Sequence, residues 1–253
     1  MDDLVRDLYG EPRPDPQAQA RVWRQLAARR RRRRLPWLAV PVVAAALALF
    51  LIVPGAPEQP LPGRSILLAA ATTAASTSAE GTYWHVRKLR DGTRETELWA
   101  TRDGRAWISE GGRVTRVEGG SPFSMAGRAM TYAQIRDLPA DPAALRERVA
   151  AMLPDAGLLA DALGGLLWTK PSPPQVRAAA YRALADLPGV RYLGERADAR
   201  GRRGAAFSFG LPSGARRTLI IDPATSQVLS STDDRAGRSE IVLVAGWTDQ
   251  GPR

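Results

Sequence analysis

An arginine run that leads directly into a long apolar stretch constrains this chain more than any other feature. Residues 36–54 are 19 consecutive residues without a charged or strongly polar side chain. As a helix rising about 1.5 Å per residue they would span about 28 Å, close to the ~30 Å hydrocarbon core of a bilayer. Trp37 stands at the basic end of this stretch, where an indole favours the membrane–water interface. We therefore predict one transmembrane helix over residues 36–54.

The arginine run predicts the orientation of that helix. Positive charges beside a membrane span stay on the cytoplasmic side, so the N-terminus is expected in the cytoplasm and the C-terminal domain outside it. The residues that set this topology are Arg29, Arg30, Arg31, Arg32, Arg33 and Arg34.

Other interpretations of the same stretch fit less well. A cleavable signal peptide has a short basic region, whereas 35 residues precede this apolar core, and the best cut, after Ala56, would place Pro57 beside it. The residues after the arginines fit a twin-arginine signal poorly. A lipid-attachment signal is excluded because it needs a cysteine, which the chain lacks. A nucleic-acid-binding arm needs no apolar span behind it. An uncleaved anchor is therefore favoured over a cleaved signal.

Composition limits the partners and the compartment. The net charge is +10, of which residues 1–35 carry +5, with ten arginines and five acidic residues. The remaining domain is only mildly basic, which does not indicate a nucleic-acid partner. Arginine outnumbers lysine 34 to two, a bias that suggests a GC-rich genome. With no cysteine, disulfides and thiolate chemistry are both excluded.

The chain divides into four predicted segments. A cytosolic juxtamembrane segment (1–35), too small to bury a core, precedes the transmembrane helix (36–54). A linker rich in proline and glycine (55–63) follows, and residues 64–253 form an extracytoplasmic domain large enough for its own core.

The pattern within residues 64–253 predicts an α+β domain. A helical segment at 64–76 is followed by four alternating runs separated by Asp-Gly and Gly-Gly hairpin signals. Three helices are predicted next, beginning after Asp141, at Leu158 and at Pro173. Five more strand-like runs end the domain, and 222–225 supplies turn chemistry between two of them. About nine strands in adjacent hairpins predict a curved antiparallel sheet packed on the central helices.

The search for catalytic motifs finds little. His85 is the only histidine and lies in the middle of a predicted strand, so we interpret it as a strand residue rather than a catalytic base. Zinc would need more histidine or cysteine than the chain has. The stretch GGLLWTK at 164–170 contains glycines and a lysine but lacks phosphate-loop spacing. Glu95 and Glu97 share one strand face, where a solvated role is favoured over acid–base work. The sequence therefore predicts no enzyme, no cofactor and no metal.

Aromatic residues supply the one candidate binding site. Trp84, Trp99 and Trp107 fall in three successive predicted strands and are expected to form one cluster. We favour a core role for that cluster. The alternative is an apolar pocket between the sheet and the apolar helix at 158–168, of the kind that binds lipid-like ligands. The residues expected to line such a pocket are Trp84, Trp99, Trp107, Leu163, Leu167 and Trp168.

Several segments together carry a resemblance that covers nearly the whole chain. GTYWHVRK at 81–88, LPADPAAL at 138–145, LPGV at 187–190 and DPAT at 222–225 follow an arginine run and one span. In these segments the chain resembles an uncharacterised family of actinobacterial single-pass membrane proteins. Some members of that family are encoded near extracytoplasmic-function sigma factors. The resemblance implies no catalytic residue. The order of elements is also similar to that of bacterial lipoprotein-carrier proteins, whose half-barrel sheet covers helices around an apolar cavity.

The sequence thus predicts a non-enzymatic, single-pass membrane protein. Its outer domain would bind an apolar ligand or a protein partner of the envelope and could sense the state of the envelope. The alternative is a regulator that binds a cytosolic sigma factor through residues 1–34. That segment is short for such a role, and the zinc motif of many anti-sigma domains is missing.

Overall fold

The computed structural model describes residues 63–78, 80–235 and 237–252. These residues belong to the second of two units in the chain, Gln59–Arg253. The predicted cytosolic segment, membrane-spanning stretch and linker, residues 1–62, lie outside the described residues. Within the described ranges, no helix is long and apolar enough to cross a membrane.

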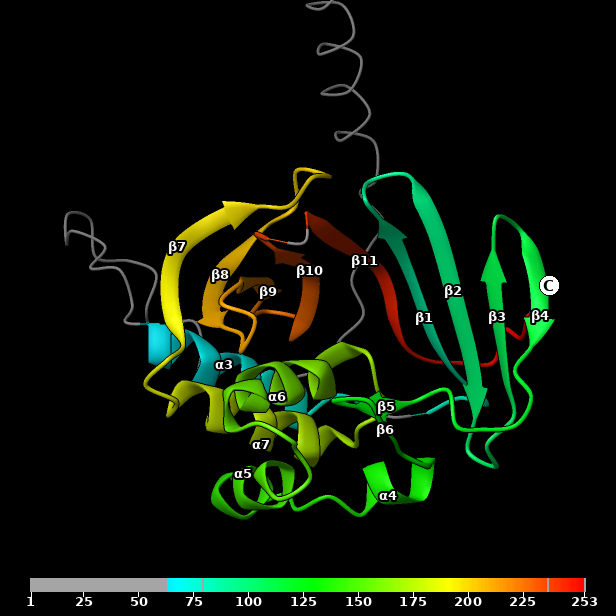
Figure 1. Cartoon of the computed structure of the whole chain (residues 1–253), viewed down its shortest axis with the longest axis horizontal. Coiled ribbons are helices and arrows are strands. Elements are labelled where there is room, and N and C mark those ends of the chain that lie inside the picture. The colour runs from blue at the N-terminus through cyan, green and yellow to red at the C-terminus, as the bar shows by residue number, and fades with distance from the viewer. Residues whose placement is uncertain (1–62, 79, 236, 253) are drawn as a thin grey trace, which may run out of the picture. The chain divides into compact units, whose positions relative to one another are not determined.

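A nine-stranded sheet forms the framework of the domain (Figure 1). All of its strand pairs are antiparallel, and their order is β4-β3-β2-β1-β11-β10-β9-β8-β7. The strands are β1 (Tyr83–Arg90), β2 (Arg94–Thr101), β3 (Ala106–Glu110), β4 (Arg113–Arg116), β7 (Arg191–Ala197), β8 (Arg203–Gly210), β9 (Arg216–Asp222), β10 (Gln227–Asp233) and β11 (Arg238–Thr248). The predicted antiparallel sheet of an α+β domain is confirmed.

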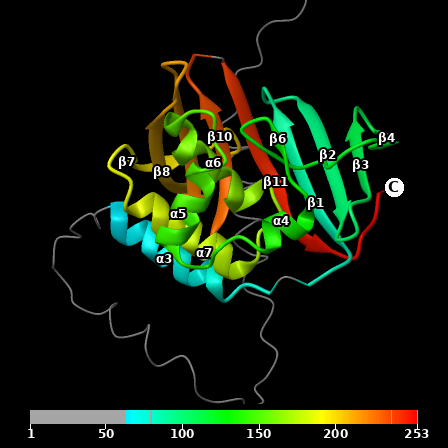
Figure 2. The same ribbon diagram turned by 60° about the horizontal axis from the view of Figure 1, so that its bottom comes forward.

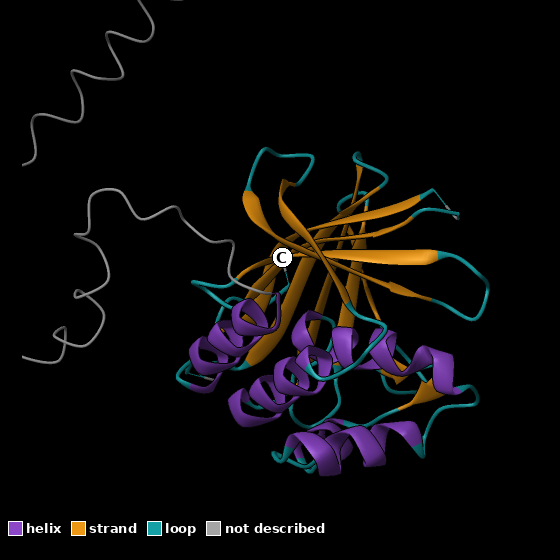
Figure 3. Ribbon diagram, turned by 90° about the vertical axis from the view of Figure 1, so that its left-hand side faces the viewer, coloured by secondary structure: helices purple, strands orange, loops and turns teal. Residues whose placement is uncertain are grey.

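The helices gather on one side of the curved sheet, which we call its inner face (Figures 2 and 3). Helix α7 packs against α3, α5 and α6, and α6 also contacts β10. The helices are α3 (Gly63–Ala75), α4 (Tyr132–Arg136), α5 (Pro142–Ala150), α6 (Leu159–Trp168), preceded by a 3₁₀ turn at Ala156–Leu158, and α7 (Pro174–Ala185).

Local sequence signals account for most of these elements. The carboxylate of Asp141 accepts a hydrogen bond of 2.8 Å from the Ala144 amide and so caps α5, with Pro142 in the first turn. Gly111 and Gly112 both adopt positive φ between β3 and β4, which a tight hairpin of this length requires. These two predicted signals are confirmed.

One hydrophobic core joins the inner face of the sheet to the helices. Leu145, Leu163, Leu166 and Tyr181 are wholly buried in it. The inward faces of α5 and α7 therefore carry Leu145 and Tyr181, respectively. The domain is stabilised by this core without a disulfide.

Two features between β4 and α5 were not predicted. A small hairpin pairs β5 (Ser124–Met125) with β6 (Arg128–Ala129), and helix α4 follows it. Thr131 and Gln134 form a capping box at the start of α4. A two-residue strand is too short to show alternation, and a five-residue helix too short to show helical periodicity.

Candidate functional site

The register of β1, β2 and β3 separates the three tryptophans that were predicted to cluster. Trp84 lies opposite Ala100, whereas Trp99 lies opposite both His85 and Trp107. Directly opposed residues of paired strands point to the same face. Trp84 is therefore on one face of the sheet, and Trp99 and Trp107 are on the other. The predicted single cluster was wrong, because an offset of one residue in register reverses the face.

Trp84 points to the inner face and belongs to the core. It is 2% exposed and shares the hydrophobic core with Leu163, Leu167 and Trp168. Its ring also packs edge-on against Trp247, with 6.0 Å between the ring centroids. Trp84, Leu163 and Leu167 are thus packed against other side chains and line neither of the two cavities described below.

The outer face carries the histidine. The ring of His85 stacks on Trp99 with centroids 4.7 Å apart, and its Nε2 lies 2.7 Å from Glu97 Oε2. Glu95 lies 3.9 Å from the Arg87 guanidinium on the same strand pair. His85 and the two glutamates are therefore engaged with neighbours on the side of the sheet away from the helices.

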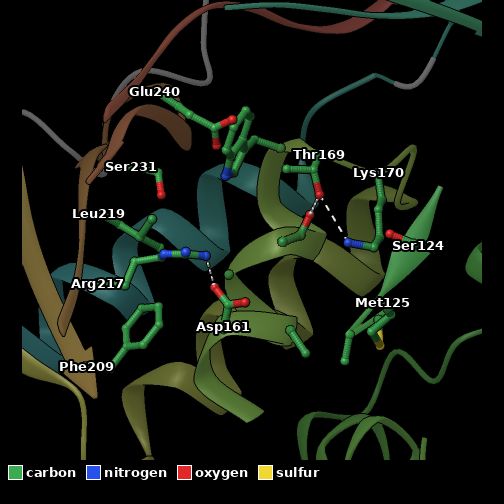
Figure 4. A pocket seen from close by; sticks show the side chains of 15 residues that line it. Ser124, Met125, Asp161, Thr169, Lys170, Phe209, Arg217, Leu219, Ser231 and Glu240 are labelled. Atoms are coloured by element: carbon green, nitrogen blue, oxygen red, sulfur yellow. Dashed lines mark hydrogen bonds and ion pairs between the residues drawn. The ribbon is translucent and has the colours of Figure 1, made fainter. Parts of the chain in front are cut away.

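A cavity of about 220 Å³ lies between α6, the β5–β6 hairpin and the inner face of the sheet (Figure 4). We call it the lysine cavity. Ser124 and Ala126 of the hairpin are exposed and form part of its rim. The residues that line it are Ser124, Met125, Ala126, Asp161, Ala162, Gly164, Gly165, Trp168, Thr169, Lys170, Phe209, Arg217, Leu219, Ser231 and Glu240.

Most charged groups at the lysine cavity are held in ion pairs. Asp161 of α6 accepts a hydrogen bond from the Arg217 guanidinium, which crosses from β9 (Figure 4). The same guanidinium lies 3.5 Å from Asp233. Glu240 of β11 accepts a hydrogen bond of 2.6 Å from Lys88. The carboxylates that line the cavity are therefore neutralised by cations of the sheet.

Lys170 differs from these groups. Its residue is 5% exposed, and its ammonium donates a hydrogen bond of 3.1 Å to Thr169 Oγ1 (Figure 4). No carboxylate of the described residues lies within 4 Å of the Lys170 nitrogen. Burial lowers the pKa of Lys170 from its ordinary value of 10.5 to about 8, and the negative charge of Asp161 opposes that shift.

A second cavity of about 340 Å³ adjoins the first, and we call it the β1–β3 cavity. The two share Ser124, Trp168 and Thr169 as wall residues. Lys88 lies over the Trp168 ring, 5.3 Å from its centroid. The β1–β3 cavity is lined by both apolar and polar residues: Val86, Lys88, Arg90, Thr96, Glu97, Leu98, Ile108, Glu110, Pro122, Ser124, Trp168 and Thr169.

Of the six residues predicted to line a ligand site, Trp168 is the one that borders both cavities. In the sequence, the stretch 164–170 has glycines and a lysine but lacks the spacing of a phosphate-binding loop. Those glycines do line the lysine cavity, but through close packing: a Cβ on Gly164 would lie 3.2 Å from Leu219. No sequence signal marked Lys170 as buried, because its burial depends on how the segment after α6 meets the β5–β6 hairpin.

The described residues contain no group of three or more His, Asp or Glu side chains placed to hold a metal ion. The candidate site is therefore built from paired charges, one buried ammonium and a mixed apolar wall. Such a site can bind and orient a ligand that carries both negative charge and apolar surface.

Comparisons with known proteins add little to this geometry. No protein-family model matches the chain, and no curated protein does either. Two similar solved structures are "Crystal structure of MucB in complex with MucA(peri)" and "The complex structure of Pseudomonas aeruginosa MucA/MucB". The first has 14% identity over 74% of this chain and 57% of the other, and the second 13% over 71% and 54%.

Both of these likenesses have a TM-score of 0.29. The match spans little more than half the length of either solved chain, and a TM-score of this size does not establish a shared fold or function. The resemblance to the actinobacterial family stays a prediction.

Proposed function

We propose that this chain is a non-enzymatic, membrane-anchored binding protein whose extracytoplasmic domain takes up an amphiphilic ligand and reports on the envelope. The observation that carries the proposal is the pair of adjoining cavities between the inner face of the sheet and α6. Both are bordered by Trp168, Thr169 and Ser124, so the two cavities are neighbours, and in this proposal one ligand occupies both.

The two cavities differ in character, which suits a ligand with two kinds of surface. The β1–β3 cavity offers apolar contact at Val86, Leu98 and Ile108. The lysine cavity is lined by hydroxyls and charged groups around Lys170. Ligand sites commonly combine an apolar wall with a few convergent polar groups that fix orientation. This combination narrows the predicted apolar ligand to one with a polar end.

Two observations support a binding role without catalysis. The only histidine of the chain, His85, lies on the outer face with Glu97, away from the lysine cavity. The carboxylates lining that cavity, Asp161 and Glu240, are engaged with cations. A general base needs a lone pair that is free to accept a proton from substrate.

The membrane anchor and the orientation rest on the sequence. Residues 36–54 are long and apolar enough to span a bilayer, and the arginines at 29–34 favour a cytoplasmic N-terminus. The chain has no cysteine, so a single introduced cysteine reports its own location. A membrane-impermeant maleimide applied to intact cells should label Ser65→Cys and leave Asp3→Cys unlabelled until the cells are opened. Labelling of Asp3→Cys in intact cells would contradict the proposed orientation.

The binding function is tested by native mass spectrometry of the full chain released from detergent. The wild-type protein is expected to carry an additional lipid-sized mass. Ser124→Trp should remove that mass, because residue 124 is exposed and borders both cavities. Ser65→Trp, at an exposed site on α3, is the matched control and should retain it. A wild-type protein without any bound mass would contradict the proposal, as would equal loss from both variants.

A further inference from the structure

The position of Lys170 points to what the lysine cavity binds. Lys170 follows the last turn of α6, where lysines commonly donate to the final helix carbonyls. Its ammonium instead donates to the Thr169 hydroxyl and lies over Gly165, where an added Cβ would be 2.9 Å from the Lys170 nitrogen. An ammonium has three donors, and burial at 5% exposure limits the water that can reach them.

The charges around the cavity leave Lys170 without a counter-charge at ion-pair distance. Asp161 is engaged with Arg217, and Glu240 with Lys88. Within the part of the chain that the structure describes, no carboxylate approaches the Lys170 nitrogen to within 4 Å. A buried ammonium with a single hydroxyl partner is costly unless a negative charge is brought to it. Lys170 is therefore the one cation lining the lysine cavity that has no carboxylate at ion-pair distance among the described residues.

We propose that Lys170 binds the monoanionic headgroup of an amphiphile, a carboxylate or a phosphodiester, whose apolar chain lies in the β1–β3 cavity. This inference rests on the proposed function and names the ligand class of that same site. A single uncompensated ammonium matches one negative charge, whereas a phosphate monoester at pH 7 carries nearly two.

The neighbouring cavity favours an amphiphile over a small free anion. Trp168 lines both the lysine cavity and the β1–β3 cavity. A headgroup at Lys170 would thus place its first methylene groups beside the indole and the following ones against Val86 and Leu98. Burial of each methylene contributes about 0.8 kcal/mol, a gain that acetate or inorganic phosphate cannot make.

The test uses the full chain in nanodiscs of zwitterionic phosphatidylcholine, with empty nanodiscs subtracted. The probes are radiolabelled dodecanoate, dodecyl methyl phosphate, uncharged dodecanol, and acetate, all at pH 7. A hydrogen-bonded charge pair should make the better dodecyl anion bind about 10- to 100-fold more tightly than dodecanol. Whichever anion binds more tightly identifies the headgroup, and acetate should bind far more weakly than dodecanoate.

Two variants assign that preference to Lys170. Lys170→Met keeps the length of the stem and removes the charge, so the preference for the anion over dodecanol should disappear while dodecanol still binds. Gly165→Ala places a methyl group 2.9 Å from the Lys170 nitrogen, so the ammonium must shift and the preference should fall in part. Arg64→Met removes an exposed cation at the Asp186 ion pair and should leave the preference unchanged. Circular dichroism of each variant shows that it is folded.

The possible failures are distinguishable. If wild-type protein binds dodecanol and the dodecyl anions equally, or if Lys170→Met keeps the preference, the headgroup assignment is overturned and the proposed binding function stands. If acetate binds as tightly as dodecanoate, the site takes a small anion and the amphiphile is overturned. If no dodecyl probe binds, the proposed function itself fails.

Discussion

Replacing Lys170 with methionine should stabilise the protein at neutral pH, although it removes a hydrogen bond. Burial lowers the pKa of Lys170 from 10.5 to about 8. A displacement of one pKa unit corresponds to about 1.4 kcal/mol, so keeping this ammonium charged inside the fold costs about 3 kcal/mol. Methionine has a similar stem and no charge, and its burial is favourable. We therefore expect Lys170→Met to raise the free energy of unfolding at pH 7 by about 2–4 kcal/mol.

The same pKa shift predicts how the difference in free energy of unfolding between wild type and Lys170→Met, here called the gap, depends on pH. Between pH 8 and 10.5 the unfolded chain keeps the proton on Lys170 while the folded chain has lost it. Stability rises with pH wherever the unfolded state binds more protons. The wild-type protein should thus gain stability relative to Lys170→Met as the pH rises from 8, by about 1.4 kcal/mol per unit. Below pH 8 the gap should be constant.

The assay is denaturant unfolding of the full chain in detergent, after removal of bound amphiphile, followed by tryptophan fluorescence at pH 7, 8, 9 and 10. Tyr181, whose pKa is raised by burial, is present in both proteins, so its contribution cancels in the difference. Arg64→Met serves as the control, since its exposed guanidinium should produce no pH-dependent gap. A gap that does not change between pH 7 and 10, or a Lys170→Met protein less stable than wild type at pH 7, would refute the reasoning.

Three further substitutions test the fold by the same unfolding assay. Gly204→Ala should destabilise by about 1–3 kcal/mol, because its Cβ would lie 2.6 Å from the Ile221 carbonyl oxygen of the neighbouring strand. Asp141→Ala should lower the free energy of unfolding by about 1 kcal/mol, because the α5 cap is lost. Asp141→Asn keeps a capping oxygen and should retain most of that stability. Tyr181→Phe should cost about 1 kcal/mol, since its hydroxyl donates a 2.9 Å hydrogen bond to the Ser226 carbonyl.

Each of these outcomes has a clear contrary result. A stable Gly204→Ala protein would mean that β8 and β9 do not approach as closely as described. Equal loss from the alanine and asparagine variants of Asp141 would point away from capping. A loss far above 1 kcal/mol in Tyr181→Phe would be unexpected, because Arg177 also donates to the Ser226 carbonyl, at 3.2 Å.

The sequence was informative where local chemistry decides the structure. Hairpin glycines such as Gly111 and the Asp141 cap predicted turns and helix starts that the structure confirms. These signals act within a few residues and do not depend on the rest of the fold. They were enough to predict an antiparallel sheet packed on helices.

The candidate site depended on long-range pairing, which the sequence does not display. Trp84 and Trp99 looked alike as strand residues, and the register of β1 against β2 placed them on opposite faces. Lys170 looked like an ordinary lysine at a helix end, and it became buried when β5 and α6 closed around it. In both cases one decisive neighbour, Ala100 for Trp84 and the β5–β6 hairpin for Lys170, is more than ten residues away in the chain.

The place of β11 in the sheet has a consequence for how the domain is made. β11 lies between β1 and β10 in the sheet, although it is the last of the described strands in sequence. It pairs with β1 along eight residue positions and with β10 along four. A chain still emerging from a ribosome or an export channel therefore holds two separate half-sheets until its final strand arrives. Because contacts so distant in sequence form slowly, we expect the final docking of β11 to limit the folding rate, and a chain ending before residue 238 to lose the centre of its sheet rather than an edge.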